Sequence, residues 1–110
     1  MTQHLPELDL FEITHPSFPT VFYARRRSER DHLDQTPLAR QAEIIFGIAF
    51  KKCLVEIVAE GSSTEAHGTL SIWREHVPGE IRITRRAATL EERHSYRTGS
   101  GFIEPRGVYG

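Results

Sequence analysis

Two segments of the chain, TLSIWREH (residues 69–76) and IRITRR (residues 81–86), alternate apolar and polar side chains with a period of two. This period predicts β-strands that have one buried face and one exposed face. The intervening VPGE (77–80) favours a turn, because proline fixes φ and glycine tolerates positive φ. These residues therefore predict an antiparallel hairpin, whose loop has either two or four residues.

Both loop lengths give the same register for this hairpin. That register pairs Glu75 with Arg82 and Trp73 with Thr84. One face then carries apolar residues, which we expect to be buried against a helix: Leu70, Ile72, Ile81 and Ile83. The other face carries one tryptophan among charged and polar residues: Ser71, Trp73, Glu75, Arg82, Thr84 and Arg86.

One long helix is expected upstream of the hairpin. Thr36 is suited to cap its start and Pro37 to occupy its first helical position. The apolar residues that recur at helical spacing are Leu38, Ala42, Ile45, Phe46, Ala49 and Cys53. Two further apolar residues fall on the opposite side: Ile44 and Ile48. We expect the helix to end near residues 50–52, since a longer helix would place Glu56 in the apolar stripe.

The rest of the chain predicts strands, loops and a second, short helix. Further strands are expected at 8–15, 20–24 and 53–59, a loop or a solvated helical turn at 25–35, and a loop at 61–68. Thr89 and Glu92 form the pattern of a capping box, which predicts a helix that starts near Leu90. The order of elements predicts an α+β, two-layer domain. We expect an antiparallel sheet of three to four strands packed on one main helix, followed by a short C-terminal helix.

Length and composition limit the class of protein. A chain of 110 residues fits one domain, which we expect to span residues 1–96, with residues 97–110 as a tail or docking arm. No apolar run approaches the ~20 residues that a membrane span needs, so we expect a cytoplasmic protein without a membrane partner. The single cysteine, Cys53, lies in an apolar run and is expected to be a buried thiol.

The charged residues give a mixed signal about nucleic acids. The net charge of −1 and the pI of about 6.6 exclude a polycationic binder. Arginines nevertheless outnumber lysines by twelve to two, and the arginine guanidinium suits bidentate contact with phosphate. Genomic base composition produces the same ratio without any function, so the ratio alone does not choose between these explanations.

The polar hairpin face allows two interpretations. In one, Arg82 and Arg86 hold a phosphate, Glu75 or His76 moves a proton, and Trp73 stacks on a base. In the other, Glu75 and Arg82 form a surface ion pair and Trp73 packs beneath the C-terminal helix. The six histidines lack the spacing of a zinc site, so neither a metal nor another cofactor is expected.

The segment RRAATLEERHSY resembles the C-terminal signature of the BrnT toxin family, in which a strand ending in arginine continues into A-T-x-x-E-R-x-x-Y. The matching residues are Arg86, Ala88, Thr89, Glu92, Arg93 and Tyr96. Upstream, LSIWREH is similar to the family's hairpin strand: Trp73 occupies its aromatic position, Glu75 matches its glutamate and His76 stands where the family has arginine. The similarity is greatest over residues 69–96.

This resemblance implies a RelE-like fold and a metal-independent bacterial ribonuclease toxin that inhibits translation and is neutralised by a cognate antitoxin. Glu75 would be the base, His76 the acid and Tyr96 an orienting group. Three arginines would stabilise the charge that grows on phosphorus: Arg82, Arg86 and Arg93. Residues expected to contact the RNA substrate are Trp73, Arg74 and Arg85. The protein would form a homodimer or a hetero-oligomer with the antitoxin.

A non-catalytic interaction module, encoded by a phage or mobile element, is the alternative. It would use the face that carries Trp73, together with the C-terminal arm at residues 97–110, to dock on another protein. Expression of the chain alone separates these functions, because a ribonuclease should stop growth and a binding module should not.

Overall fold

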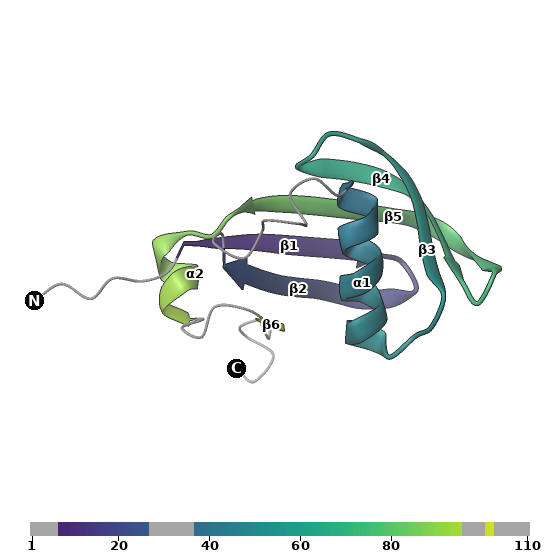
Figure 1. Ribbon diagram of the computed structural model, residues 1–110, viewed down its shortest axis with the longest axis horizontal. Helices are drawn as coiled ribbons and strands as arrows, with labels where there is room; N and C mark the ends of the chain where they lie inside the picture. The colour runs from purple at the N-terminus through teal and green to yellow at the C-terminus, as the bar shows by residue number, and fades with distance from the viewer. Residues whose placement is uncertain (1–6, 27–36, 96–100, 103–110) are drawn as a thin grey trace, which may run out of the picture.

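A computed structural model describes residues 7–26, 37–95 and 101–102. The strands in this part of the chain are β1 (Leu8–His15), β2 (Phe18–Arg26), β3 (Val55–Gly61), β4 (Glu65–Ile72), β5 (Glu75–Ala87) and β6 (Gly101–Phe102), and the helices are α1 (Leu38–Phe50) and α2 (Leu90–Ser95). The strands form a single sheet in the order β3-β4-β5-β1-β2-β6, and every neighbouring pair is antiparallel (Figure 1).

The predicted fold class is wrong. Instead of a RelE-like sheet of three to four strands packed on one main helix with a C-terminal helix, the molecule is mostly an antiparallel sheet of six strands. Among the described residues, α1 is the one helix longer than the six residues of α2. The physical reason is the pairing of β1 with β5, which places the N-terminal hairpin in the middle of the sheet. Because β1 and β5 are far apart in the sequence, no local sequence pattern indicates that they pair.

The main core lies between α1 and one face of the sheet. In Figure 1, α1 crosses the strands at a steep angle. Its buried apolar residues are Leu38, Ala42, Ile45 and Phe46, and they belong to one cluster with Phe11, Ile13, Ile57, Leu70, Ile81 and Ile83. The prediction that the hairpin buries one apolar face is therefore confirmed for Leu70, Ile81 and Ile83, while Ile72 is half-buried and packs at the margin of the core.

The ends of α1 lie close to the predicted positions. Pro37 occupies the N-cap and Leu38 begins the helix, while Thr36 lies outside the described residues. The helix ends at Phe50, and Lys51 takes a left-handed conformation in which its backbone N–H donates to the carbonyl of Gly47. Cys53, predicted to be a buried thiol, is exposed. The reason is that α1 ends three residues before Cys53 and β3 begins two residues after it, so Cys53 lies in the connection between them.

The predicted turn of the central hairpin is wrong. β4 starts at Glu65, within the predicted loop, and joins β5 through Trp73 and Arg74, both of which have positive φ. The expected turn at 77–80 lies inside β5, where the register shifts between the pairs Gly68–Ile81 and Leu70–Val77.

Close packing against a neighbouring turn explains why the VPGE segment contains a glycine although it lies at the register shift inside β5 and not in a turn. Gly79 has φ +115°, and a Cβ at this position would lie 2.5 Å from the Cγ of Pro16. Pro16 belongs to the turn between β1 and β2. The glycine of the VPGE segment therefore lets β5 pass beside a neighbouring turn, and a side chain would block this approach.

Other strand ends differ modestly from the predictions. β1 has the expected bounds, whereas β2 extends beyond the expected residues 20–24 and includes Arg25 and Arg26 of the expected loop. β3 begins and ends two residues later than expected. Gly101 and Phe102, from the segment expected as a tail or arm, form β6 and pair with Ala24 and Tyr23 of β2. No described helix is long and apolar enough to cross a membrane.

Candidate functional site

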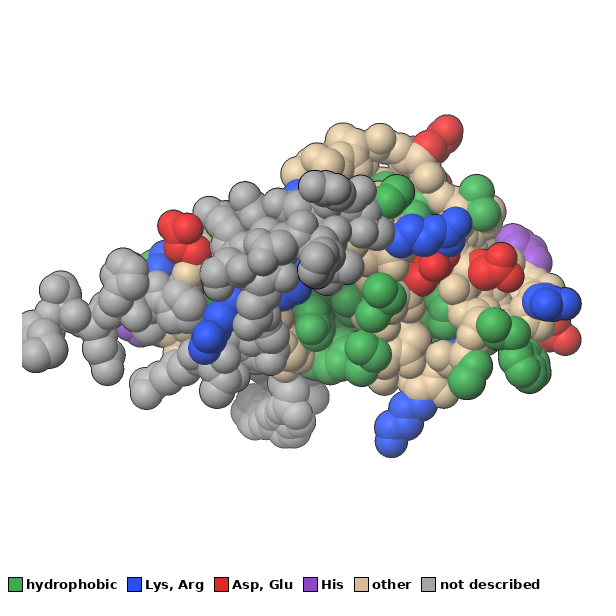
Figure 2. All heavy atoms as spheres, in the orientation of Figure 1, with side chains coloured by type: hydrophobic (Ala, Val, Ile, Leu, Met, Phe, Trp, Pro, Cys, Tyr) green, Lys and Arg blue, Asp and Glu red, His purple; other side chains and the backbone are tan. Residues whose placement is uncertain are grey.

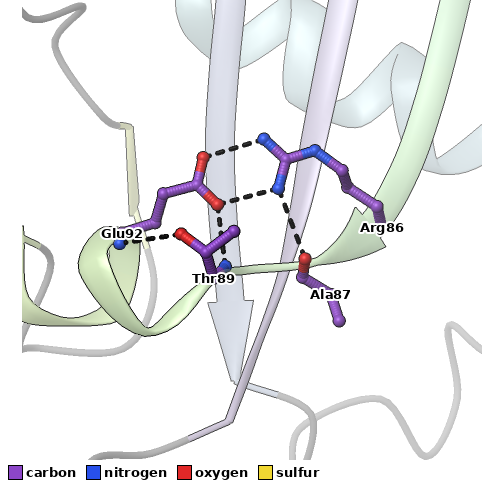
Figure 3. Close-up of polar contacts among 4 residues, drawn as sticks. All are labelled: Arg86, Ala87, Thr89 and Glu92. Carbon is purple, nitrogen blue, oxygen red and sulfur yellow. Dashed lines mark hydrogen bonds and ion pairs between the residues drawn. The ribbon is translucent and has the colours of Figure 1, made fainter.

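Arg86, at the end of β5, is held by Glu92 of α2. Its two terminal nitrogens donate to the two carboxylate oxygens of Glu92 at 2.7 and 2.8 Å, and Nη1 also donates to the carbonyl of Ala87 at 3.3 Å (Figure 3). This fork-to-fork geometry is the strong form of an arginine–carboxylate contact. The guanidinium is thus oriented by the protein itself.

The same carboxylate caps α2. Oε1 of Glu92 accepts the backbone N–H of Thr89 at 2.8 Å, and Oγ1 of Thr89 accepts the backbone N–H of Glu92 at 3.2 Å. The predicted capping box and the short helix that follows it are therefore confirmed. Of the residues that resemble the BrnT signature, Glu92 contacts both Arg86 and Thr89, so a structural requirement accounts for the spacing of these three.

This contact changes the electrostatics of both partners. The hydrogen bonds from Arg86 lower the pKa of Glu92 from 4.5 to about 2, and the N–H of Thr89 adds to the effect against an opposing contribution from burial. The hydrogen bonds to Glu92 also raise the pKa of Arg86. The charge of Arg86 is thus balanced within the molecule, and a phosphate would have to compete with Glu92 for the two N–H groups that the carboxylate binds.

Arg82 also has a carboxylate partner on its own strand. Its Nε donates to Glu80 at 2.8 Å, and Nδ1 of His67 lies 3.3 Å from the other oxygen of that carboxylate. The pKa of Glu80 is lowered chiefly by its hydrogen bond from Arg82. Across the sheet, Arg82 stands opposite His67 of β4, and Glu75 stands opposite Ile72. The predicted pairs Glu75–Arg82 and Trp73–Thr84 are therefore wrong, because the hairpin turns at Trp73 and Arg74.

The other predicted site residues are spread over the molecule. Trp73, Arg74, Glu75 and His76 are exposed at the tip of the β4–β5 hairpin. Glu75 stands opposite Ile72 and Arg82 opposite His67, five positions apart along β4, and at ~3.3 Å per residue this corresponds to roughly 16 Å. The structure therefore does not bring the predicted base together with Arg82 or Arg86.

Three predicted residues remain to be located. Arg85 is half-buried in β5 and lines a pocket of about 510 Å³ beside the start of α1. Arg93 is half-buried on α2, and its backbone N–H donates to the carbonyl of Thr89 at 2.9 Å. Tyr96 lies outside the described residues. No group of three or more histidine, cysteine or acidic residues in the described ranges could hold a metal ion.

A different group of side chains stands out at the far end of the molecule. Ile44 and Ile48 of α1, Leu54 before β3 and Trp73 of the hairpin turn are 54%, 57%, 50% and 66% exposed, respectively. The backbone N–H of Trp73 donates to the carbonyl of Leu54 at 3.0 Å, so these two residues are neighbours. Figure 2 shows hydrophobic side chains at this end among charged ones, with further hydrophobic side chains nearer the middle of the same face. We call these four residues the apolar end surface.

Sequence reasoning contained one signal for this surface. Ile44 and Ile48 fall outside the apolar stripe of α1, which is the pattern of a helix with a second apolar side. Trp73 was expected to be an exposed aromatic on a strand face, whereas it lies in a turn. Leu54 carried no signal, since it lies within an apolar run that predicts a buried strand.

Comparisons with protein families, with curated proteins and with solved structures gave no match to this chain. The resemblance to the BrnT family therefore stays a prediction, and a function has to be inferred from the chain's own residues.

Proposed function

We propose that this chain is a non-catalytic protein-interaction module that binds its partner through the apolar end surface. The observation that carries this proposal is the exposure of four large apolar side chains at one end of the molecule. Exposed apolar groups occur on every protein, but a group of them in one place indicates an interaction site. Burying such area contributes roughly 25 cal/mol per Å², so even part of this surface would add substantially to binding.

Backbone conformation supports the same location. Among the described residues, the non-glycine residues with positive φ are Lys51, Leu54, Trp73 and Arg74. All of them lie between the end of α1 and β3 or in the β4–β5 turn, next to or within the apolar end surface. A left-handed conformation costs a non-glycine residue roughly 1–2 kcal/mol. Strained residues of this kind gather at functional sites, where the surrounding structure maintains them.

Trp73 gives the most specific case. A two-residue hairpin turn with both central residues at positive φ favours Asn-Gly, yet this turn has Trp73 and Arg74, at φ 58° and 66°. The turn thus presents a large aromatic side chain to solvent at a cost in stability. Tryptophan and arginine are the residue types most enriched among those that dominate binding energy at protein interfaces.

The ribonuclease function stays a prediction, and less supports it. It requires a carboxylate base beside free guanidinium groups, but Glu75 lies roughly 16 Å along the sheet from Arg82. Arg82 and Arg86 both donate to carboxylates within the chain. Phosphate binding would have to compete with these contacts, whose geometry is already favourable.

Expression of the chain alone in a bacterium tests the proposal. The interaction module should leave growth and RNA unchanged, and variants Glu75→Gln and Arg86→Ala should behave like the unmodified chain. Growth arrest with RNA cleavage that either substitution abolishes would refute the proposal in favour of the ribonuclease. A chain that stops growth equally well with both substitutions would exclude the predicted catalytic roles and would also contradict the expectation that the module leaves growth unchanged.

A further inference from the structure

The apolar end surface lies beside an open edge of the sheet. β3 is the last strand in the sheet order, so its outer side has no neighbouring strand among the described residues. The backbone N–H of Ile57 donates to Oε2 of Glu43 at 2.8 Å, which shows that this group points away from β4. Because alternate residues of an antiparallel strand point to the same side, the polar groups of Val55 and Ala59 also face outward.

A groove runs along this edge, between β3 and the outer side of α1. It has a volume of about 460 Å³ and is lined by Glu43, Ile44, Gly47, Ile48, Lys52, Leu54 and Val55. A Cβ at Gly47 would lie 3.2 Å from the carbonyl oxygen of Lys52, so glycine allows the end of α1 and Lys52 to approach closely here. A helix and an open strand edge that enclose an apolar groove are the elements that bind extended peptides by strand addition.

The charges that line the groove favour an acidic occupant. Glu43 is the one carboxylate of the lining, and it is already engaged by Arg40 and by the N–H of Ile57. Lys52 also lines the groove, and its neighbour Lys51 is exposed. Glu56 lies between the outward-facing residues, so its side chain projects to the sheet face away from α1. The groove thus combines apolar walls with a lysine that forms no ion pair with a carboxylate of the described residues.

We propose that β3 binds an extended acidic peptide segment of a partner protein as an added strand. This inference rests on the proposed function and names the partner's chemistry. The peptide backbone pairs with the open groups of Val55, one of its apolar side chains enters the groove against Ile44 and Ile48, and its carboxylates approach Lys52. The backbone N–H of Ile57 already donates to Glu43, so the added strand pairs chiefly with the first half of β3.

Synthetic peptides test the inference directly. The probe is acetyl-DVEIDVE-amide, with a basic counterpart, KVKIKVK, and a proline-interrupted counterpart, DVEPDVE. Trp73 is the only tryptophan of the chain and neighbours Leu54, so its fluorescence reports binding. We expect the acidic peptide to bind at least about threefold more tightly than the basic one, the difference that one exposed ion pair provides. The proline peptide should bind at least about tenfold more weakly, because it cannot complete the added strand.

Variants locate the binding. Val55→Pro removes an outward N–H without removing a hydrogen bond to β4, and it should weaken acidic-peptide binding by about tenfold. Lys52→Glu, which leaves the strand unchanged, should remove the preference for the acidic peptide. Val58→Thr, exposed on β3, is the matched control and should change neither. Equal binding of all three peptides, or a preference that survives Lys52→Glu, would overturn the inference.

Photo-crosslinking of the full chain from position 48, in the cell that encodes it, separates this inference from the proposed function. A partner protein captured from position 48 without any binding of the acidic peptide would overturn strand addition and leave the interaction module in place. Absence of both a captured protein and peptide binding would overturn both.

Discussion

Replacement of Glu92 by glutamine tests whether the resemblance to a toxin signature has a structural cause. Glutamine keeps the shape of the side chain and can still accept the N–H of Thr89, but it removes the charge that Arg86 binds. The pKa of Glu92 falls from 4.5 to about 2 on folding. Without screening by solvent, this lowering of the pKa would stabilise the native state by ~3 kcal/mol. Because the side chain of Arg86 is 48% exposed, screening by solvent reduces the contribution to about 1–2 kcal/mol.

The sign of the pH dependence follows from the lowered pKa. The contribution is fully present above the unfolded pKa of 4.5 and is lost as the pH falls toward the folded value of about 2. Glu92→Gln should therefore unfold more easily than the unmodified chain by about 1–2 kcal/mol at pH 7. The two proteins should become equally stable near pH 2.

Urea denaturation at several pH values measures this difference. Hydrogen exchange of the Arg93 amide, which donates to the carbonyl of Thr89, reports the same loss within α2. Glu75→Gln, at an exposed strand position, is the matched control and should stay within ~0.5 kcal/mol of the unmodified chain. If Glu92→Gln changed neither stability nor exchange, or if its effect did not diminish with acid, the structural explanation of the signature would be refuted.

Two further predictions concern the end of the molecule that carries the apolar surface. Replacing Trp73 and Arg74 by Asn-Gly should stabilise the chain in urea denaturation by about 1–2 kcal/mol, since Asn-Gly adopts this turn without strain. The same replacement should weaken partner binding. Unchanged or lower stability would contradict the inference that the turn is strained. Glu43→Ala should leave the backbone N–H of Ile57 without its acceptor and lower the stability in urea denaturation by about 1–2 kcal/mol. It should also increase self-association, measured by light scattering, because the outer edge of β3 is then open to pair with another chain. Glu56→Ala, which changes a carboxylate of β3 itself, should not increase self-association. Equal self-association of the two variants would show that Glu43 does not protect the edge of β3.

Local patterns predicted individual elements well. β1 has the expected bounds, and the capping box at Thr89 and Glu92 starts α2 where expected. The apolar face of Leu70, Ile81 and Ile83 was also predicted correctly, although the register was wrong. The reason is that the true and predicted registers differ by an even number of residues, which leaves every side chain on the same face.

Long-range features could not be read from the sequence. Nothing local indicates that β1 pairs with β5, and without this pairing the six-stranded sheet is not predictable. The hairpin turn was missed because Pro78 and Gly79 have stronger turn chemistry than Trp73 and Arg74, and only packing against Pro16 shows that Gly79 serves another purpose. The predicted site failed for a related reason, since a shifted turn moves Glu75 away from Arg82.

Site-specific photo-crosslinking tests the central claim most directly. A photoreactive phenylalanine analogue would replace Ile48 in the apolar end surface or, as the control, Val58 on the opposite face of β3, and the full chain would be irradiated in the cell that encodes it. The interaction module predicts a discrete protein adduct from position 48 that is absent from position 58 and diminishes when Leu54 is changed to asparagine. No adduct from position 48, or identical adducts from both positions, would contradict it.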